Sequence, residues 1–291
     1  MDHYLRLAGL RILLRAPFAL RPHACLRPFL TDTGSEQAWN IRYTLLSNAE
    51  RQAFPADAHC IFSDRRMRIS QYSGGKIWQF SAWAADPSSP QNPLLLEIAP
   101  NDFLLFFPEQ QLARLADASD FTNFLALEAI LARFDRLFLH SSVVLWQGKA
   151  LAFCAASGVG KSTHAALWAS HLGADILNGD RCLLEPVEGG FLAHGSPCAG
   201  SSGIYRRDCA PLAGIFLLQQ AQENQVRRVS HAEAFRSLLQ QSVIIQWEEA
   251  LTARACDLLL RLTQCLPVWQ LSCRPDPEAA LLARETAFPS P

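Results

Sequence analysis

The sequence lacks several features that mark whole classes of protein. Its nine cysteines include no C-x-x-C pair and no His/Cys cluster at zinc-site spacing, which argues against a disulfide framework and a zinc knuckle and favours a reducing cytoplasm. An excess of charge of one sign is missing too, because 26 Lys and Arg residues stand against 27 Asp and Glu residues. Without a basic field, nucleic acid and anionic membrane surfaces are poor candidate partners.

Long apolar runs are also missing. The apolar N-terminus is interrupted by Arg6, Arg11 and Arg15 and has no small-residue cleavage site, so it does not resemble a signal peptide. The longest later stretch, residues 94–107, is broken by polar residues and a proline and is too short to cross a bilayer. We therefore expect no membrane span. The 49% hydrophobic content is ample for a substantial core, in one large domain or two small ones.

The first third of the chain alternates short β-prone runs with turn residues. Five such runs stand out, at residues 5–14, 41–46, 66–72, 77–83 and 94–98. The Ser-Gly-Gly sequence at 73–75 predicts a hairpin turn. Residues 120–134 carry apolar side chains at helical spacing, which predicts a helix leading into a second domain. We predict an α/β protein with a β-rich N-terminal domain over residues 1–119 and a second domain over residues 120–291.

The most informative segment is CAASGVGKST, which runs from Cys154 to Thr163. It follows a strand-like run at 150–156 and opens a helix-like run at 162–172, so we expect a strand, a tight loop and a helix in succession. A loop with little side-chain bulk can turn backbone N–H groups toward phosphates, and the helix N-terminus adds its positive dipole. The segment departs from the pattern G-x-x-x-x-G-K-[ST] only at Ala155, a small steric change.

This pattern predicts a site for ATP or GTP. Lys161 would reach the β- and γ-phosphates, and the Ser162 hydroxyl would coordinate Mg²⁺. The expected nucleotide-binding residues are the consecutive residues Ala156, Ser157, Gly158, Val159, Gly160, Lys161, Ser162 and Thr163. The alternative is an ordinary strand-turn-helix corner of the same composition.

Phosphoryl transfer also needs a carboxylate for the metal and groups that orient the acceptor. Asp180 is the best metal candidate, because it lies at an Asn-Gly-Asp turn within the next strand-like run, 175–184; the alternative is a plain turn residue. His140 lies in the run 138–146, which we expect to pair with the loop-bearing strand, so it could reach the same pocket. The alternative for His140 is a structural, hydrogen-bonded role.

Downstream residues extend the α/β pattern. The segment 195–207 is rich in small residues and ends in Arg206 and Arg207, as a substrate loop with an anion clamp would; a solvated surface loop is the alternative. Strands are expected at 212–218 and 268–273. Helices are expected after the capping pattern Ser230-x-x-Glu233 and after Asp276-Pro277.

Three motifs in this order resemble the HPr kinase/phosphorylase C-terminal domain family: LHSS at 139–142, SGVGKST at 157–163 and ILNGD at 176–180. The resemblance covers roughly residues 136–285 and extends to the HPr-kinase-related subgroup. It implies a P-loop fold akin to ATP-dependent phosphoenolpyruvate carboxykinase, with ATP and Mg²⁺ as cofactors. By motif position it implies that Lys161 binds phosphates, Ser162 and Asp180 contact the metal, and His140 lies near the transferring phosphate.

The resemblance implies an ATP-dependent kinase that transfers the γ-phosphoryl group to a Ser or Thr hydroxyl of a protein or peptide, with Asp180, His140 and Lys161 in catalysis. Some similar proteins tailor ribosomally made peptides, and kinases of the family form rings, so a precursor peptide and a homo-oligomer are implied partners. Gly179 stands where the family has a first aspartate, the base in the true kinases. The alternatives are a weak or inactive ATP-binding regulatory module and, less favoured, a P-loop hydrolase.

Overall fold

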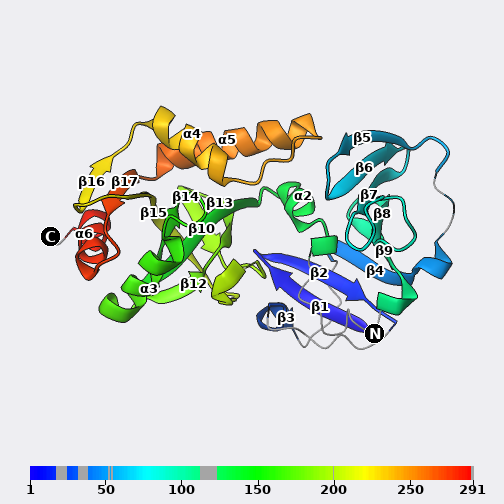
Figure 1. The fold of residues 1–291 in the computed structure, drawn as a ribbon, viewed down its shortest axis with the longest axis horizontal. Coiled ribbons are helices and arrows are strands. Elements are labelled where there is room, and N and C mark those ends of the chain that lie inside the picture. Colours follow the sequence, from blue (N-terminus) through cyan, green and yellow to red (C-terminus); the bar gives the residue numbers. More distant parts are fainter. Residues whose placement is uncertain are drawn as a thin grey trace. The chain divides into compact units, whose positions relative to one another are not determined.

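The computed structural model describes residues 1–17, 25–31, 39–51, 53, 55–111, 123–198 and 200–289. The chain packs as two compact units, Met1–Ile130 and Leu131–Pro291, a division that lies beyond the predicted boundary at residue 119. Each unit is built on one large β-sheet (Figure 1). The mixed α/β class is therefore confirmed, with more strand than the sequence predicted.

The first unit contains a nine-stranded sheet with the order β3-β1-β2-β4-β9-β8-β7-β6-β5. Its strands are β1 (Asp2–Leu7), β2 (Leu10–Arg15), β3 (Leu30–Thr31), β4 (Ile41–Ser47), β5 (His59–Ser63), β6 (Met67–Tyr72), β7 (Gly75–Phe80), β8 (Leu94–Ala99) and β9 (Asp102–Phe107). Two short 3-10 helices, η1 (Arg27–Phe29) and η2 (Asn48–Glu50), lie between strands. The pairs β2–β4 and β4–β9 are parallel and the other pairs are antiparallel.

The predicted strands of this unit are present, and two elements differ from the prediction. Residues 5–14 form two strands instead of one run, because Ala8 and Gly9 take the positive φ angles of a tight turn, 47° and 77°. The predicted helix at 120–134 is shorter: α2 spans Leu127–Ala132, and residues 120–122 lie outside the described part. The hairpin turn at 73–75 is confirmed by the antiparallel pairing of β6 with β7.

The second unit contains eight strands in the order β11-β10-β13-β14-β15-β17-β16, with β12 paired to β10. They are β10 (Leu137–Trp146), β11 (Lys149–Cys154), β12 (Asp175–Asn178), β13 (Arg181–Val187), β14 (Gly190–His194), β15 (Cys209–Gln220), β16 (Gln225–Arg228) and β17 (Val268–Cys273). The helices are α3 (Lys161–Leu172), η4 (Gly200–Ser202), α4 (His231–Gln241), α5 (Glu249–Cys265) and α6 (Pro277–Ala287). Because β11 also pairs with β15 in parallel, five of the strands close into a ring.

Strand β11 is buried on both faces, and its side chains alternate between two cores. Ala150, Ala152 and Cys154 join a core that includes residues of α4 and α5. Leu151 and Phe153 join a second core that includes residues of α3 and α6. A central strand covered on both sides in this way reads as a continuous apolar run, as its sequence does.

The predicted helix ends of this unit are present. Ser230 Oγ accepts the Glu233 N–H at 3.3 Å, and Asp276 Oδ1 accepts the Ala279 N–H at 3.0 Å. Gly173 ends α3 with a φ of 68°. The strand-like run 175–184 is divided into β12 and β13 at the Asn-Gly-Asp turn, and α5 was not predicted.

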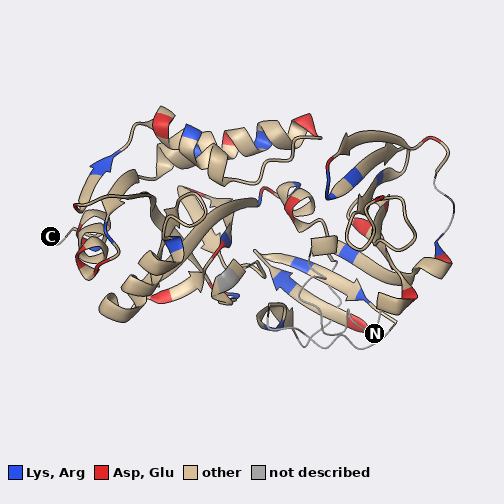
Figure 2. Ribbon diagram, viewed as in Figure 1, with Lys and Arg blue, Asp and Glu red and all other residues tan. Residues whose placement is uncertain are grey.

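Three features of the described residues relate to the composition of the chain. Lys and Arg are interspersed with Asp and Glu over both units (Figure 2). Of the helices in the described ranges, none is long and apolar enough to cross a membrane. The described part of the chain contains no disulfide bond.

Candidate functional site

The loop between β11 and α3 is shaped by two glycines. Gly158 and Gly160 have φ angles of 81° and 120°, which side chains other than hydrogen adopt only with strain. A Cβ added to either would meet no heavy atom within 4 Å, so the backbone conformation, and not crowding, requires glycine. Gly160 is also the N-cap of α3 and provides no side-chain cap. The N-terminus of α3 therefore lies open to an anion.

The backbone of this loop keeps donors available. The Val159 N–H makes a long bond of 3.4 Å to the Ala156 carbonyl, whereas within the described ranges the N–H groups of Gly158 and Gly160 donate to no backbone or side-chain acceptor. Gly158 is exposed and Gly160 is partly exposed. Backbone N–H groups that gather in one turn can form a concave binding site for an anion.

Lys161, the first residue of α3, folds back onto the loop. Its Nζ donates to the Ala155 carbonyl at 2.9 Å and to the Ala156 carbonyl at 3.4 Å, and the residue is only 8% exposed. Burial lowers the pKa of Lys161, and the negative charge of Asp180 opposes that effect. The Lys161 amine can therefore give up these two carbonyl acceptors and bind a phosphate at the loop without first moving out into solvent.

The Asn-Gly-Asp turn is held by the buried Asn178. Its Oδ1 accepts the N–H groups of Asp180 at 2.9 Å and of Arg181 at 2.8 Å, and its Nδ2 donates to the Ser196 carbonyl at 3.2 Å. On the other side of the turn, a Cβ at Gly200 would lie 2.9 Å from Asp180 Cγ. The backbone of the Asp180 turn is therefore fixed by the Asn178 amide, and the Gly200 backbone lies close to the Asp180 side chain.

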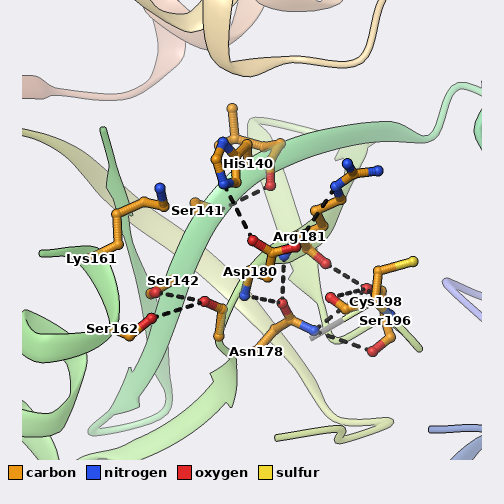
Figure 3. A network of polar contacts seen from close by, with 12 residues as sticks. His140, Ser141, Ser142, Lys161, Ser162, Asn178, Asp180, Arg181, Ser196 and Cys198 are labelled. Atoms are coloured by element: carbon orange, nitrogen blue, oxygen red, sulfur yellow. Dashed lines mark hydrogen bonds and ion pairs between the residues drawn. The ribbon is translucent and has the colours of Figure 1, made fainter. Parts of the chain in front are cut away.

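Two basic groups flank this carboxylate. His140 Nε2 lies 3.2 Å from Asp180 Oδ1, and Arg181 Nε lies 3.8 Å from Asp180 Oδ2 (Figure 3). His140 and Arg181 are opposite one another in the β10–β13 register, so their side chains share a face. Burial and the charge of Lys161 lower the pKa of His140, against the effect of Asp180. The imidazole is therefore neutral at neutral pH and donates to the carboxylate.

Oxygen atoms gather beside the helix N-terminus. The Gly179 carbonyl accepts the Ser142 hydroxyl at 2.9 Å and the Ser162 hydroxyl at 3.5 Å, next to the Asp180 carboxylate (Figure 3). Hydroxyl, carbonyl and carboxylate oxygens are the ligands that Mg²⁺ accepts. Across the described residues no three His, Cys, Asp or Glu side chains form a metal cluster. A metal ion bound here would therefore take its remaining oxygen ligands from a bound molecule or from water.

A pocket of about 860 Å³ opens beside the loop. Its walls come from the loop glycines, from the first two turns of α3, and from the ends of β15 and β17. The apolar lining includes Val159, Leu167, Leu218, Ala221 and Pro275. The volume is that of a site for a nucleotide-sized molecule.

The fold brings together four of the residues singled out in the sequence: His140, Lys161, Ser162 and Asp180 (Figure 3). Arg206 is engaged elsewhere, because its Nη2 bonds Asp175 Oδ1 at 2.9 Å, at the opposite end of β12 from Asp180.

Arg207 is exposed. Sequence reasoning missed Ser142, Asn178 and Arg181. Asn178 had a signal, since an Asn two residues before an Asp is typical of a side-chain-capped turn, whereas Ser142 and Arg181 depend on strand register.

No family model and no curated protein matches this sequence. Among solved structures, the chain is similar to the HPr(Ser) kinase/phosphatase from Coxiella burnetii, with a TM-score of 0.32 and 12% sequence identity. The match covers 52% of this chain and 87% of that one. The likeness is distant and carries no information about activity.

Proposed function

We propose that the unit Leu131–Pro291 binds ATP with Mg²⁺ and transfers the γ-phosphoryl group to a Ser or Thr hydroxyl of a peptide or protein. The observation that carries this proposal is a buried lysine at the uncapped N-terminus of α3, beside the carboxylate of Asp180, whose backbone turn is held by Asn178. A cationic amine, free loop N–H groups and a helix dipole together favour a polyphosphate over a neutral ligand.

The chain's own residues divide the work in this proposal. Loop N–H groups and Lys161 bind the phosphates, while Ser162 and Asp180 hold Mg²⁺, which when bound would neutralise charge on the phosphate oxygens. His140, hydrogen-bonded to Asp180, orients the acceptor hydroxyl. Arg181 offers a second cation on the same face.

A second candidate, an ATP-binding regulatory module with little or no catalysis, is favoured by Gly179. This residue has no side chain that could act as a base, and its carbonyl is occupied by two hydroxyls. Because phosphoryl transfer depends mainly on positioning and electrostatics, the missing side chain lowers the expected rate without excluding transfer.

The test is a calorimetric titration of the full chain with ATP, with and without Mg²⁺. Binding should require Mg²⁺ and weaken roughly 10- to 100-fold in Lys161→Ala, since a hydrogen bond to a charged group is lost. Asp180→Ala should remove the Mg²⁺ dependence. Matched controls are Lys149→Ala, an exposed lysine at the start of β11, and Asp175→Ala, at the other end of β12, neither of which should change binding.

Transfer is then measured with γ-labelled ATP and Ser/Thr peptides. Label transfer that disappears in Asp180→Ala would support the kinase and rule out the inactive module. Tight Mg²⁺-dependent binding with no label transferred to any peptide or protein would favour the module instead. If the wild-type chain binds no ATP, both candidates are wrong.

A further inference from the structure

His164, which lines the pocket beside the loop, has one unused hydrogen-bond donor. It lies one turn into α3, lines the pocket and is only 3% exposed. Its Nε2 lies 3.3 Å from Trp168 Nε1, and an indole N–H can only donate. Nε2 must therefore accept, and the neutral ring carries its proton on Nδ1. Among the described residues, Nδ1 has no hydrogen-bond partner.

An acceptor lines the same pocket. Gln220, at the end of β15, donates its Nε2–H to the Val159 carbonyl at 3.3 Å, which leaves its Oε1 to accept. Gln220 and Val159 are both lining residues, so this bond also joins the strand end to the loop. The pocket thus offers one donor and one acceptor between apolar walls.

The cation at this pocket is already neutralised. Arg274 Nε bonds Asp276 Oδ2 at 2.8 Å, and its Nη2 lies 3.2 Å from Glu278 Oε2. Its backbone N–H donates to Asn224 Oδ1 at 2.8 Å, which fixes the wall formed by residues 273–275. A second phosphate group, which needs uncompensated positive charge, is therefore a poor occupant of this pocket.

We infer that this pocket takes the purine base of the nucleotide, and that His164 selects for it by donating its Nδ1–H to a base nitrogen or carbonyl oxygen. A purine edge carries both donors and acceptors, and its flat bicyclic face suits apolar walls such as Leu167 and Leu218. The inference rests on the proposed function, because it assumes that the phosphates lie at the adjoining loop.

The test compares ATP with inorganic tripolyphosphate, each with Mg²⁺, in titrations of the full chain. Wild type should bind ATP at least tenfold more tightly than tripolyphosphate. His164→Phe should lower ATP affinity about three- to tenfold, the equivalent of one neutral hydrogen bond, and leave tripolyphosphate affinity unchanged. His171→Phe, at the exposed end of α3, is the matched control and should change neither.

His164→Gln is the rescue variant, because glutamine can accept from Trp168 with its Oε1 and donate to the base with its Nε2. It should keep ATP affinity within about twofold of wild type. If His164→Phe does not fold, the comparison of ATP with tripolyphosphate in wild type still tests the pocket. A larger loss of ATP affinity in His164→Gln would contradict the inference.

Other outcomes separate this inference from the proposed function. Equal wild-type affinity for ATP and tripolyphosphate would leave the phosphate site standing and overturn the base pocket. If His164→Phe lowers the affinities for ATP and for tripolyphosphate equally, His164 has only a structural role, which also overturns the inference. Binding of neither ligand by wild type would defeat the proposed function and the inference together.

Discussion

Asn92 of the first unit and Asn178 of the second are almost completely buried, at 1% and 0% exposed, yet their hydrogen bonds serve different purposes. Asn92 Oδ1 accepts the N–H groups of residues 82–84, and its Nδ2 donates to the carbonyls of Ala84 and Asp86. Every one of these bonds closes the loop before β8. Asn178 instead holds the amides of Asp180 and Arg181.

The difference lies in where each network ends. The Asn92 network ends in backbone groups of its own loop, so its hydrogen bonds stabilise the conformation of that loop. The Asn178 network holds the backbone of Asp180 and Arg181, two residues whose charged side chains are partly exposed beside the buried Lys161. A buried polar group that positions charged side chains beside one another is a candidate for function, whereas one that only closes a loop is structural.

Replacing each asparagine by alanine should separate these two roles. Asn92→Ala should lower the free energy of unfolding by roughly 3 kcal/mol, because buried N–H groups lose their acceptor, without changing Mg²⁺·ATP affinity. Asn178→Ala should cost similar stability and also weaken Mg²⁺-dependent ATP binding about tenfold, since the Asp180 turn is released. Denaturant unfolding followed by circular dichroism, together with calorimetry, measures both. If ATP binding were weakened in Asn92→Ala and not in Asn178→Ala, the roles assigned to the two asparagines would be reversed.

Local patterns predicted the parts of the site that depend on neighbouring residues. The strand, the loop and the turn were predicted from the continuous apolar run before Cys154, the glycines at 158 and 160 and the Asn-Gly-Asp sequence, because each is determined by a few consecutive residues. Helix α5 was missed because its N-cap, Glu248, makes no side-chain cap that would mark its start.

The pairing of β10 with the loop-bearing strand β11 was predicted and is confirmed, but pairings between strands farther apart in the sequence could not be predicted. Arg181 faces His140 only because β13 pairs with β10 in one register, and a shift of one residue would turn its side chain away. The ring of strands depends on the parallel pairing of β11 with β15, across an intervening chain that contains three other strands. Neither pairing is indicated by any pattern in the sequence between the paired strands.

Acid should act on the second unit more than on the first. Neither described histidine of the first unit, His3 or His59, is buried, whereas burial lowers the pKa of His164 to about 4 and also lowers the pKa of His194. Because the folded pKa lies below the unfolded value, the unfolded chain binds more protons as the pH falls through 6.5, and stability is lost. For His164 the loss between pH 7 and pH 5 is about 2 kcal/mol.

Urea unfolding at these two pH values measures that loss. His164→Gln has no titratable group at this position, so its stability should fall by about 2 kcal/mol less than that of wild type over the same interval. Identical pH dependence in the two proteins would show that His164 does not carry the effect. Tryptophan fluorescence and amide exchange can assign the transition to one unit or the other.

The smallest expected effect concerns the two arginines that flank β12. Arg206 bonds Asp175, which is 64% exposed, and a surface pair of this kind contributes about 0–1 kcal/mol. Arg206→Ala should therefore change ATP affinity less than twofold, whereas Arg181→Ala, which removes the cation beside Asp180, should weaken it more. Both affinities are read from the same titration. A tenfold loss in Arg206→Ala would mean that Arg206 leaves Asp175 and binds the phosphates, as the anion-clamp interpretation of segment 195–207 predicts. The turn held by Asn178 would then be only part of the site.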